Sequence, residues 1–155
     1  MGSRLETNVA YIAGFLDGDG SLMLQIKKRC DNGRPRFMAT ICFYQDTHHD
    51  KSLFWIKDIL GIGYISKRND GMTELRINGF KQIEKILKML LPYIRFKKVQ
   101  ASTLLKAVSL LQRKKLVTND YKKLVDYMLT IQSENYSTKK KRTKYELLKV
   151  LGLTP

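Results

Sequence analysis

Two pairs of short segments in this chain alternate apolar with polar residues, and a strong turn signal separates the members of each pair. Alternation with a period of two is the pattern of a strand with one buried face, and turn residues between two such strands predict a hairpin. Four strands in two hairpins favour an antiparallel sheet. The predicted hairpins join Leu22–Lys27 to Arg36–Tyr44 across Asp31–Pro35, and Tyr64–Arg68 to Thr73–Asn78 across Asn69–Gly71.

Segments with apolar residues at helical spacing precede, separate and follow the two hairpins. The predicted helices are Asn8–Asp17 with Thr7 or Asn8 as N-cap, a helix capped by Asp46 or Thr47 that runs to Leu60, Phe80–Leu91, Lys97–Leu111, Asp120–Ile131 and Tyr145–Leu151. In the helix that ends at Leu60 we expect Leu53, Phe54, Ile56, Ile59 and Leu60 to be buried. The order α-β-β-α-β-β-α with a helical tail predicts an α+β fold, in which helices back one face of the sheet and leave the other free.

The length of 155 residues suits one domain, and no internal repeat indicates a second. We expect residues 1–155 to form this domain, with a frayed leader over 1–7 and a basic loop and helix over 136–155. No apolar run is long enough to cross a membrane or to act as a signal peptide, which predicts an intracellular protein that is not secreted. Cys30 and Cys42 lie in predicted strands without a zinc-site spacing, so we expect packing residues in a reducing compartment.

The charge indicates a polyanionic partner. Lys and Arg total 29 against 14 acidic residues, giving a net charge of +15. Neutralising phosphates releases counterions and gives affinity for nucleic acid without any reading of sequence. A membrane-surface protein and a ribosomal-type RNA binder are the alternatives that charge alone leaves open. The free face of the sheet is predicted to carry Gln25, Lys27, Arg29, Arg36, Lys67, Arg68 and Arg76.

A second basic feature is the run Lys139, Lys140, Lys141 and Arg142. It predicts a loop that grips phosphates. The alternatives are a nuclear-localisation-like patch and a plain solubilising charge run.

Small residues recur every four positions in the first predicted helix, at Ala10, Gly14 and Gly18. Such a stripe lets two helix backbones approach closely. Because the chain has only one helix of this kind, its partner is expected to be the same helix of a second copy. The predicted interface comprises Ala10, Tyr11, Ala13, Gly14, Asp17 and Gly18.

Asp17 and Asp19 stand at the C-terminal end of this helix, where the helix dipole already places negative charge. A locally unfavourable arrangement of this kind points to function. Two copies would bring two Asp19 carboxylates and backbone carbonyls together, and hard oxygen ligands suit Mg²⁺. An ordinary acidic turn is the alternative reading of Asp17-Gly18-Asp19-Gly20.

The segment Tyr11–Ser21 resembles the signature of the LAGLIDADG homing endonucleases, in particular their small single-motif algal organellar members. Gln25–Lys27, Gly61–Tyr64 and Pro92–Ala101 resemble further segments of the family, so that the resemblance covers about residues 8–111. It implies the family's fold, a homodimer and metal-dependent cleavage of both strands of a long, nearly palindromic double-stranded DNA site with 3′ overhangs. It also implies Mg²⁺, with Mn²⁺ or Ca²⁺ able to replace it in binding, no small-molecule cofactor, and an organelle such as the chloroplast or mitochondrion as the compartment.

The resemblance implies a role for each matching residue. Asp19 would bind the metal with help from the Gly18 carbonyl, while Asp17 would hold the turn. Gln45 would order water in the active site, and Lys97 would lie beside the scissile phosphate. His49 stands where some relatives carry arginine, and this departure leaves its role open.

The charged side chains of the sheet suggest how DNA would be read. Arginine suits guanine and glutamine suits adenine in the major groove, which makes Gln25, Arg29, Arg36, Arg68 and Arg76 the candidates for base contacts. Lys27, Arg34 and Lys67 would contact bases or phosphates. The alternatives to an endonuclease are an intron-splicing maturase or a cleavage-inactive DNA-binding protein on the same fold, and an RNA-binding protein in which Asp19 has no role.

Overall fold

A four-stranded antiparallel sheet with helices on one face makes up the computed structural model, which describes residues 2–28, 33–135 and 141–153. The strands are β1 (Gly20–Lys27), β2 (Arg36–Asp46), β3 (Tyr64–Lys67) and β4 (Met72–Asn78), in the spatial order β1-β2-β4-β3. The helices are α1 (Arg4–Asp19), α2 (Lys51–Leu60), α3 (Phe80–Leu90), α4 (Lys98–Leu111), α5 (Thr118–Glu134) and α6 (Lys144–Val150), and short 3-10 turns form η1 (Thr47–His49) and η2 (Leu91–Tyr93). The predicted α+β class and the predicted order of elements are confirmed.

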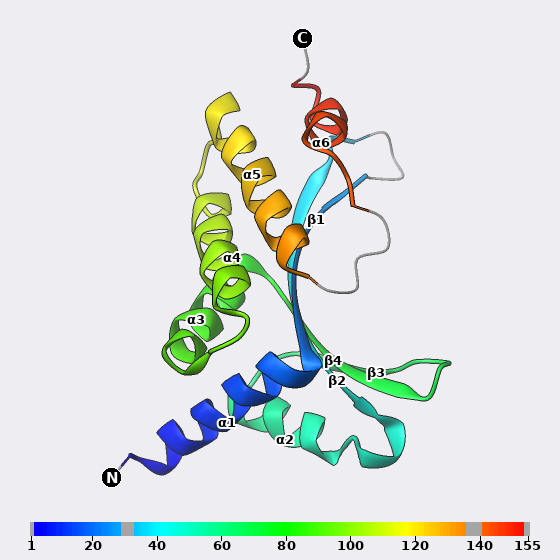
Figure 1. The fold of residues 1–155 in the computed structure, drawn as a ribbon, viewed down its shortest axis with the longest axis vertical. Helices are drawn as coiled ribbons and strands as arrows, with labels where there is room; N and C mark the ends of the chain where they lie inside the picture. Colours follow the sequence, from blue (N-terminus) through cyan, green and yellow to red (C-terminus); the bar gives the residue numbers. More distant parts are fainter. Residues whose placement is uncertain (1, 29–32, 136–140, 154–155) are drawn as a thin grey trace.

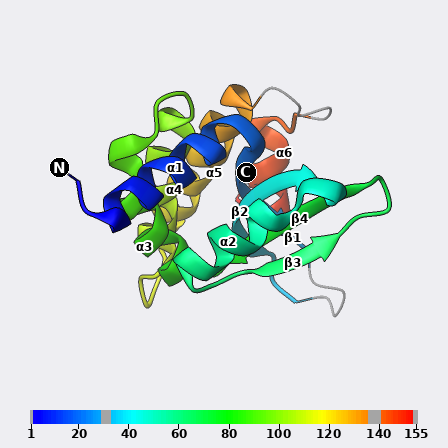
Figure 2. The ribbon, with the colours of Figure 1, turned by 90° about the horizontal axis from the view of Figure 1, so that it is seen from below.

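The helices form a layer against one face of the sheet. Helices α1, α2 and α3 contact β2, while α4 and α5 run beside β1, the strand at the sheet's edge (Figure 1). The β3–β4 hairpin extends away from α4 and α5 in both views (Figures 1 and 2). Apolar side chains from the strands fill the space under the helices: Leu22, Leu24, Ile41, Phe43, Leu75 and Ile77. The alternate residues of the strands therefore lie on a face that no described helix covers.

Helix α1 begins at Arg4, not at the predicted Asn8. The hydroxyl of Ser3 accepts a hydrogen bond from the Glu6 backbone N–H, and the Glu6 carboxylate accepts one from the Ser3 backbone N–H. This reciprocal arrangement is a capping box. The prediction of a frayed leader is wrong for residues 4–7, because Ser3 and Glu6 cap a helix one turn earlier.

Helix α2 buries fewer apolar residues than the sequence predicted. Leu53 and Ile56 are fully buried, whereas 47% of the surface of Phe54 is exposed. Asp46 caps only η1, where its carboxylate accepts a hydrogen bond from the His48 backbone N–H, and α2 starts separately at Lys51. The expectation for Phe54 is wrong because each residue turns a helix by about 100°, which takes the side chain next to Leu53 off the buried stripe.

Gly20 joins α1 to β1 without an intervening loop. Its backbone is extended, with φ −124°, so the need for glycine does not come from a left-handed conformation. A Cβ atom at this position would lie 2.8 Å from the carbonyl oxygen and 2.9 Å from the Cα atom of Leu16. The direct passage from helix to strand therefore depends on the absence of a side chain.

Replacing Gly20 by alanine is expected to lower the free energy of unfolding by about 1–3 kcal/mol, because the backbone of Leu16 has to move to admit the methyl group. Urea denaturation of the two proteins measures this difference. Ser21→Ala is the matched control: it removes one hydrogen bond, between the Ser21 and Tyr44 hydroxyls at 3.0 Å, and is expected to cost about 1 kcal/mol or less. Equal effects of the two substitutions would contradict the steric explanation.

Candidate active site and nucleic-acid interface

The C-terminal end of α1 is held by a lysine about eighty positions later in the sequence. The ammonium group of Lys97 donates hydrogen bonds to the carbonyl oxygens of Leu16 at 2.9 Å, Asp17 at 3.0 Å and Gly20 at 2.7 Å. The last carbonyls of a helix have no partner within the helix, and a cation at this end also interacts favourably with the helix dipole. Lys97 therefore caps the C-terminal end of α1, a role that was not predicted from the sequence.

Asp17 also connects the end of α1 to the segment before α4, in this case through its own side chain. Its carboxylate accepts hydrogen bonds from the backbone N–H of Arg95 at 2.7 Å and of Lys97 at 3.0 Å. These bonds fix the path of the chain between η2 and α4. The contacts fit the structural role expected for Asp17.

The ammonium group of Lys97 is partly withdrawn from solvent. Burial lowers the pKa of Lys97 below the usual value for lysine, and the nearby carboxylates of Asp17 and Asp19 oppose this shift. Desolvation disfavours the charged form of a group, whereas opposite charges favour it. The acid–base behaviour of Lys97 therefore depends on the two acidic residues at the end of α1.

Asp19 presents a free carboxylate at this position. Its side chain is exposed and accepts no hydrogen bond from any residue that the structure describes. The carbonyl of Gly18 is not among the three that Lys97 binds. A carboxylate and a carbonyl are ligands that suit Mg²⁺. Within the described ranges, no three His, Cys, Asp or Glu side chains gather as a metal site, so one chain offers an incomplete ligand set.

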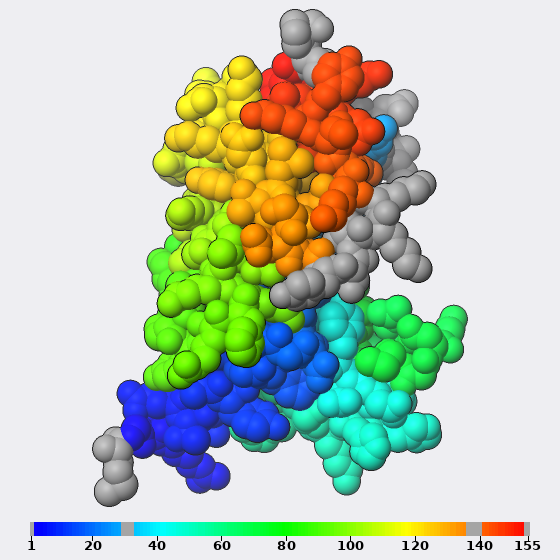
Figure 3. Space-filling model, in the orientation of Figure 1, coloured from blue at the N-terminus to red at the C-terminus, as the bar shows by residue number. Residues whose placement is uncertain are grey.

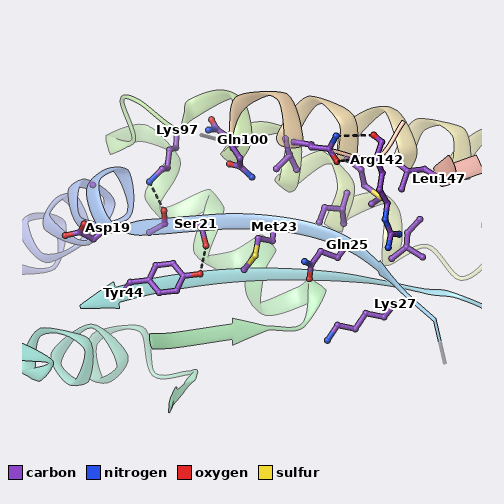
Figure 4. Close-up of a pocket in the computed structure, with 18 of the residues that line it drawn as sticks. Asp19, Ser21, Met23, Gln25, Lys27, Tyr44, Lys97, Gln100, Arg142 and Leu147 are labelled. Carbon is purple, nitrogen blue, oxygen red and sulfur yellow. Dashed lines mark hydrogen bonds between the residues drawn. The ribbon is translucent and has the colours of Figure 1, made fainter. Parts of the chain in front are cut away.

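A groove of about 920 Å³ runs from Asp19 along the edge strand β1 toward α5 and α6. Figure 4 shows Lys97 and Gln100 on one wall and Met23, Gln25 and Lys27 on the other. Tyr44 also lines the groove, and burial raises the pKa of its phenol. Tyr44 was not predicted as a site residue, although its alternation with buried Phe43 already placed it on the free face of the sheet.

Gln45 and His49 lie outside this groove. The side-chain oxygen of Gln45 accepts a hydrogen bond from the backbone N–H of Asp46 at 2.9 Å. Gln45 is not among the residues that line the groove, and strand alternation turns its side chain away from that of Tyr44. His49 is exposed on η1. The structure thus brings Asp19 and Lys97 together, but not Gln45 or His49.

The free face of the sheet carries five of the seven residues that were predicted to lie on it: Gln25, Lys27, Arg36, Arg68 and Arg76. Gln25, Lys27 and Arg36 are exposed there, with Lys27 paired to Arg36 and Gln25 to Met38. Lys67 is the exception: it pairs with Thr73, whose hydroxyl contacts Thr47 and Asp50 on the other face. The predicted face of Lys67 is wrong because the pairing of β3 with β4, not local alternation, sets its direction. Arg34 is exposed before β2, and Arg29 lies outside the described residues.

Glu74 lies between Arg68 and Arg76 on this face and was not predicted as a site residue. Its carboxylate is 3.1 Å from the guanidinium of Arg76 and 4.0 Å from that of Arg68, and only 8% of its surface is exposed. Arg68 also pairs with Asp70 at 2.8 Å. The guanidinium groups are therefore held in place on the sheet.

The cysteines were predicted to be packing residues. Cys42 is fully buried as a free thiol beside Arg76, its partner across the strands, and burial raises its pKa. Its packing role is confirmed. Cys30 lies outside the described residues.

Part of the predicted phosphate-gripping run is described. Lys141 and Arg142 are exposed before α6, and Arg142 reaches the groove. The backbone N–H and carbonyl of Arg142 bond to the side chain of Gln132 on α5. Lys139 and Lys140 lie outside the described residues.

The outer side of α1 presents the stripe of small residues. An added Cβ at Gly14 or Gly18 would meet nothing within 4 Å, so the space in front of both is open in a single chain. Tyr11 is exposed, while Ala10 and Asp17 are partly exposed. Ala13, which the sequence assigned to this surface, has no exposed area and belongs to the chain's own core. Ala13 stands about 100° from Gly14 around the helix, on the side of α1 that faces inward.

Comparisons with known proteins agree with this arrangement. Residues 12–108, more than half of the chain, match the family model described as "LAGLIDADG endonuclease". The DNA endonuclease I-CvuI of Chlorella vulgaris is 34% identical over 71% of this chain and 69% of its own length. The DNA endonuclease I-CreI of Chlamydomonas reinhardtii is 28% identical over 91% of this chain and 86% of its own. A crystal structure of I-CvuI with the I-CreI target in 2 mM Mg, its DNA not cleaved, superimposes with a TM-score of 0.79, 30% identity and 96% coverage of both chains.

The environment of Lys97 predicts its titration. Its pKa is expected to lie below that of an ordinary lysine, and Asp19→Asn is expected to lower it further, because the substitution removes a carboxylate that stabilises the ammonium form. NMR titration of the lysine side-chain carbon beside the amine measures both values, with Lys97→Met identifying the resonance. An unchanged or raised pKa in the Asp19→Asn protein would contradict the proposed coupling.

Proposed function

Because the chain belongs to the LAGLIDADG endonuclease family and is a homing endonuclease, an enzyme that cuts DNA, we propose that it works as a homodimer. Its substrate would be a nearly palindromic double-stranded site of about 20 base pairs, two half-sites of roughly one helical turn each. Hydrolysis of both strands would leave 3′ overhangs and initiate intron homing. The observation that carries this proposal is the free Asp19 carboxylate at the capped end of α1, beside a basic groove.

The homodimer is supported by α1. The outer side of this helix is open at Gly14 and Gly18, so a second backbone can approach closely. A twofold axis beside the two helices would bring both Asp19 carboxylates together and complete the ligand set that one chain lacks. Each chain would place its groove on one half-site.

The donor set at the end of α1 fits a divalent cation. The Asp19 carboxylates and the Gly18 carbonyls would hold it; Mg²⁺ is the proposed ion, with Mn²⁺ or Ca²⁺ able to replace it in binding. Support comes from similar structures with DNA in the presence of Mg or Ca. When bound, such an ion activates water and stabilises the charge that develops on a phosphodiester.

The protein's own residues would prepare this site. Lys97 fixes the end of α1, where Asp19 lines the groove, and its charge would favour the approach of a phosphate. Gln45 would order the attacking water once its side chain turns from the Asp46 backbone toward the DNA. The exposed imidazole of His49 on η1 is a candidate for contact with a phosphate.

The free face of the sheet would read the bases. A strand of about ten residues spans roughly 33 Å, close to one turn of B-DNA. The proposed base contacts come from Gln25, Arg29, Arg36, Arg68 and Arg76, with Lys27 and Arg34 contacting bases or phosphates. Lys67 would contact phosphates, because it projects from the opposite face of β3.

None of the described helices is long and apolar enough to cross a membrane. The proposed compartment is an organelle, chloroplast or mitochondrion, as implied by the resemblance to single-motif algal organellar enzymes. Two relatives come from Chlorella vulgaris and Chlamydomonas reinhardtii.

Asp19→Asn is expected to reduce DNA cleavage by about 1000-fold or more, because the loss of a charged metal ligand removes several kcal/mol of transition-state stabilisation. Binding of duplex in Ca²⁺ is expected to stay largely intact. Cleavage of a plasmid library of palindromic half-sites, with and without Mg²⁺, measures the first effect, and gel-shift titration measures the second. Retained nicking by the variant would contradict the metal assignment.

Replacing Lys139, Lys140, Lys141 and Arg142 by alanine is expected to weaken binding to all DNA sequences alike. Removing one interaction with a phosphate reduces the slope of log affinity against log salt by about 0.9. Fluorescence anisotropy with target and unrelated duplexes between 50 and 200 mM salt, a range of roughly fourfold, measures this slope. An unchanged slope would show that the run does not bind phosphates.

A further inference from the structure

Phe96 is the most exposed large apolar side chain among the residues that the structure describes, with 83% of its surface accessible. It lies between η2 and α4, and the backbone N–H groups of its two neighbours, Arg95 and Lys97, are bound by the Asp17 carboxylate. The backbone that carries the ring is therefore fixed. Burying a phenylalanine side chain stabilises a protein by about 1.5–3 kcal/mol, so a ring held outward in this way indicates a contact outside the chain.

An apolar hollow of about 320 Å³ lies between α1 and α2. Thr7, Asn8, Tyr11, Ser52 and Trp55 line it. The rings of Tyr11 and Trp55 meet edge to face with centroids 5.5 Å apart. The hydroxyl of Ser52 is buried and has no hydrogen-bond partner among the described residues, and its short side chain leaves the hollow open.

The hollow and Phe96 lie on opposite flanks of the small-residue stripe. Tyr11 precedes Gly14 by three residues and Asp17 follows it by three, and each residue turns an α-helix by about 100°. Tyr11 and Asp17 therefore stand about 60° to either side of Gly14. Trp55 packs against the first flank, and the backbone around Phe96 is bonded to the second. In Figure 3, α1 (blue) is exposed between the green surface of α3 and α4 above it and the turquoise region to its right.

Twofold symmetry then determines which flanks meet. The inference rests on the proposed homodimer, in which two α1 helices lie side by side with their Asp19 ends together. The twofold axis of such a pair runs roughly along the helices, and a half-turn about it sets each flank of one helix against the other flank of its partner. The Asp17 flank with Phe96 would thus face the Tyr11 flank with the hollow.

We infer that Phe96 of each chain inserts into the partner's hollow, against the rings of Tyr11 and Trp55 and over Ser52. The partner is a second copy of this chain, because the knob and the hollow belong to the same sequence and the contact forms twice across the axis. Aromatic rings favour edge-to-face contacts, and each inserted ring would bury about 150–250 Å². Phe96 and the hollow thereby extend the α1 interface on both sides and secure the alignment of the two Asp19 carboxylates.

Two substitutions test the fit from its two sides. Phe96→Ala removes the knob, and Ser52→Phe fills the hollow from its own chain. Each is expected to raise the dimer dissociation constant by about 100-fold, tenfold for each of the two contacts. Analytical ultracentrifugation across nanomolar to micromolar protein measures the constant, and circular dichroism verifies that each variant is folded. Tyr145→Ala, which removes another exposed aromatic ring on the distant α6, is the matched control and is expected to leave the constant unchanged.

The double variant separates a contact between chains from two independent defects. Within one chain Phe96 and Ser52 lie on opposite flanks of α1, so coupling between them arises only across the interface. The double variant is expected to dissociate no more readily than Phe96→Ala alone, since no knob is left to clash with the filled hollow. If the two effects are additive, the dimer dissociation constant of the double variant rises by about 10,000-fold, and this result would overturn the inference.

Disulfide trapping provides a test that does not depend on stability. A protein with both Phe96→Cys and Ser52→Cys is expected to form a covalent dimer on mild oxidation, while the parent protein with its own Cys30 and Cys42 stays monomeric on a non-reducing gel. A parent that sediments as a dimer, with neither coupling nor cross-linking, overturns the placement of Phe96 and leaves the homodimer standing. A parent that sediments as a monomer with and without DNA overturns both proposals.

Discussion

The contact between the Lys97 ammonium and the C-terminal carbonyls of α1 is the interaction on which the rest of the site depends. Two aspartates at a helix C-terminus oppose the helix dipole, so this end of α1 is electrostatically unfavourable by itself. Lys97 supplies the missing positive charge and satisfies carbonyls that the direct passage from α1 to β1 leaves without helical partners. Asp17 is then free to bind the backbone before α4, and Asp19 is left as the exposed carboxylate.

Local sequence patterns predicted the elements of the fold, but not the contacts that build the site. Period-two alternation identified the strands and the polar face of β1, because these properties depend on neighbouring residues. The cap formed by Ser3 and Glu6 was also readable, as a Ser-x-x-Glu pattern. The partners of Lys97 were not, since they lie about eighty positions away. The face of Lys67 was equally hidden, because a shift of one residue in strand pairing reverses the direction of a side chain.

Glu74, the buried glutamate on the free face, restrains the neighbouring arginines, an effect that net charge does not describe. A carboxylate among arginines weakens the general attraction for phosphates, so Glu74 does not serve affinity alone. Its contacts with Arg76 and Arg68 hold two guanidinium groups in defined positions. A side chain ordered before binding loses less conformational entropy when it meets a base edge. The strongly positive chain therefore combines exposed lysines, suited to non-specific attraction, with restrained arginines, suited to discrimination between bases.

The glycines of α1 distinguish what a single chain needs from what a pair of chains needs. Gly20 is explained within the chain, because a Cβ atom there would collide with Leu16. Gly14 and Gly18 have no such reason: both lie inside the helix with open space in front of them. A glycine within a helix costs about 1 kcal/mol relative to alanine, so these two positions weaken α1 with no compensating contact in their own chain. In the proposed homodimer the close approach of the second α1 supplies this compensation, and the exposed Phe96 and the hollow flank the same open stripe on its two sides.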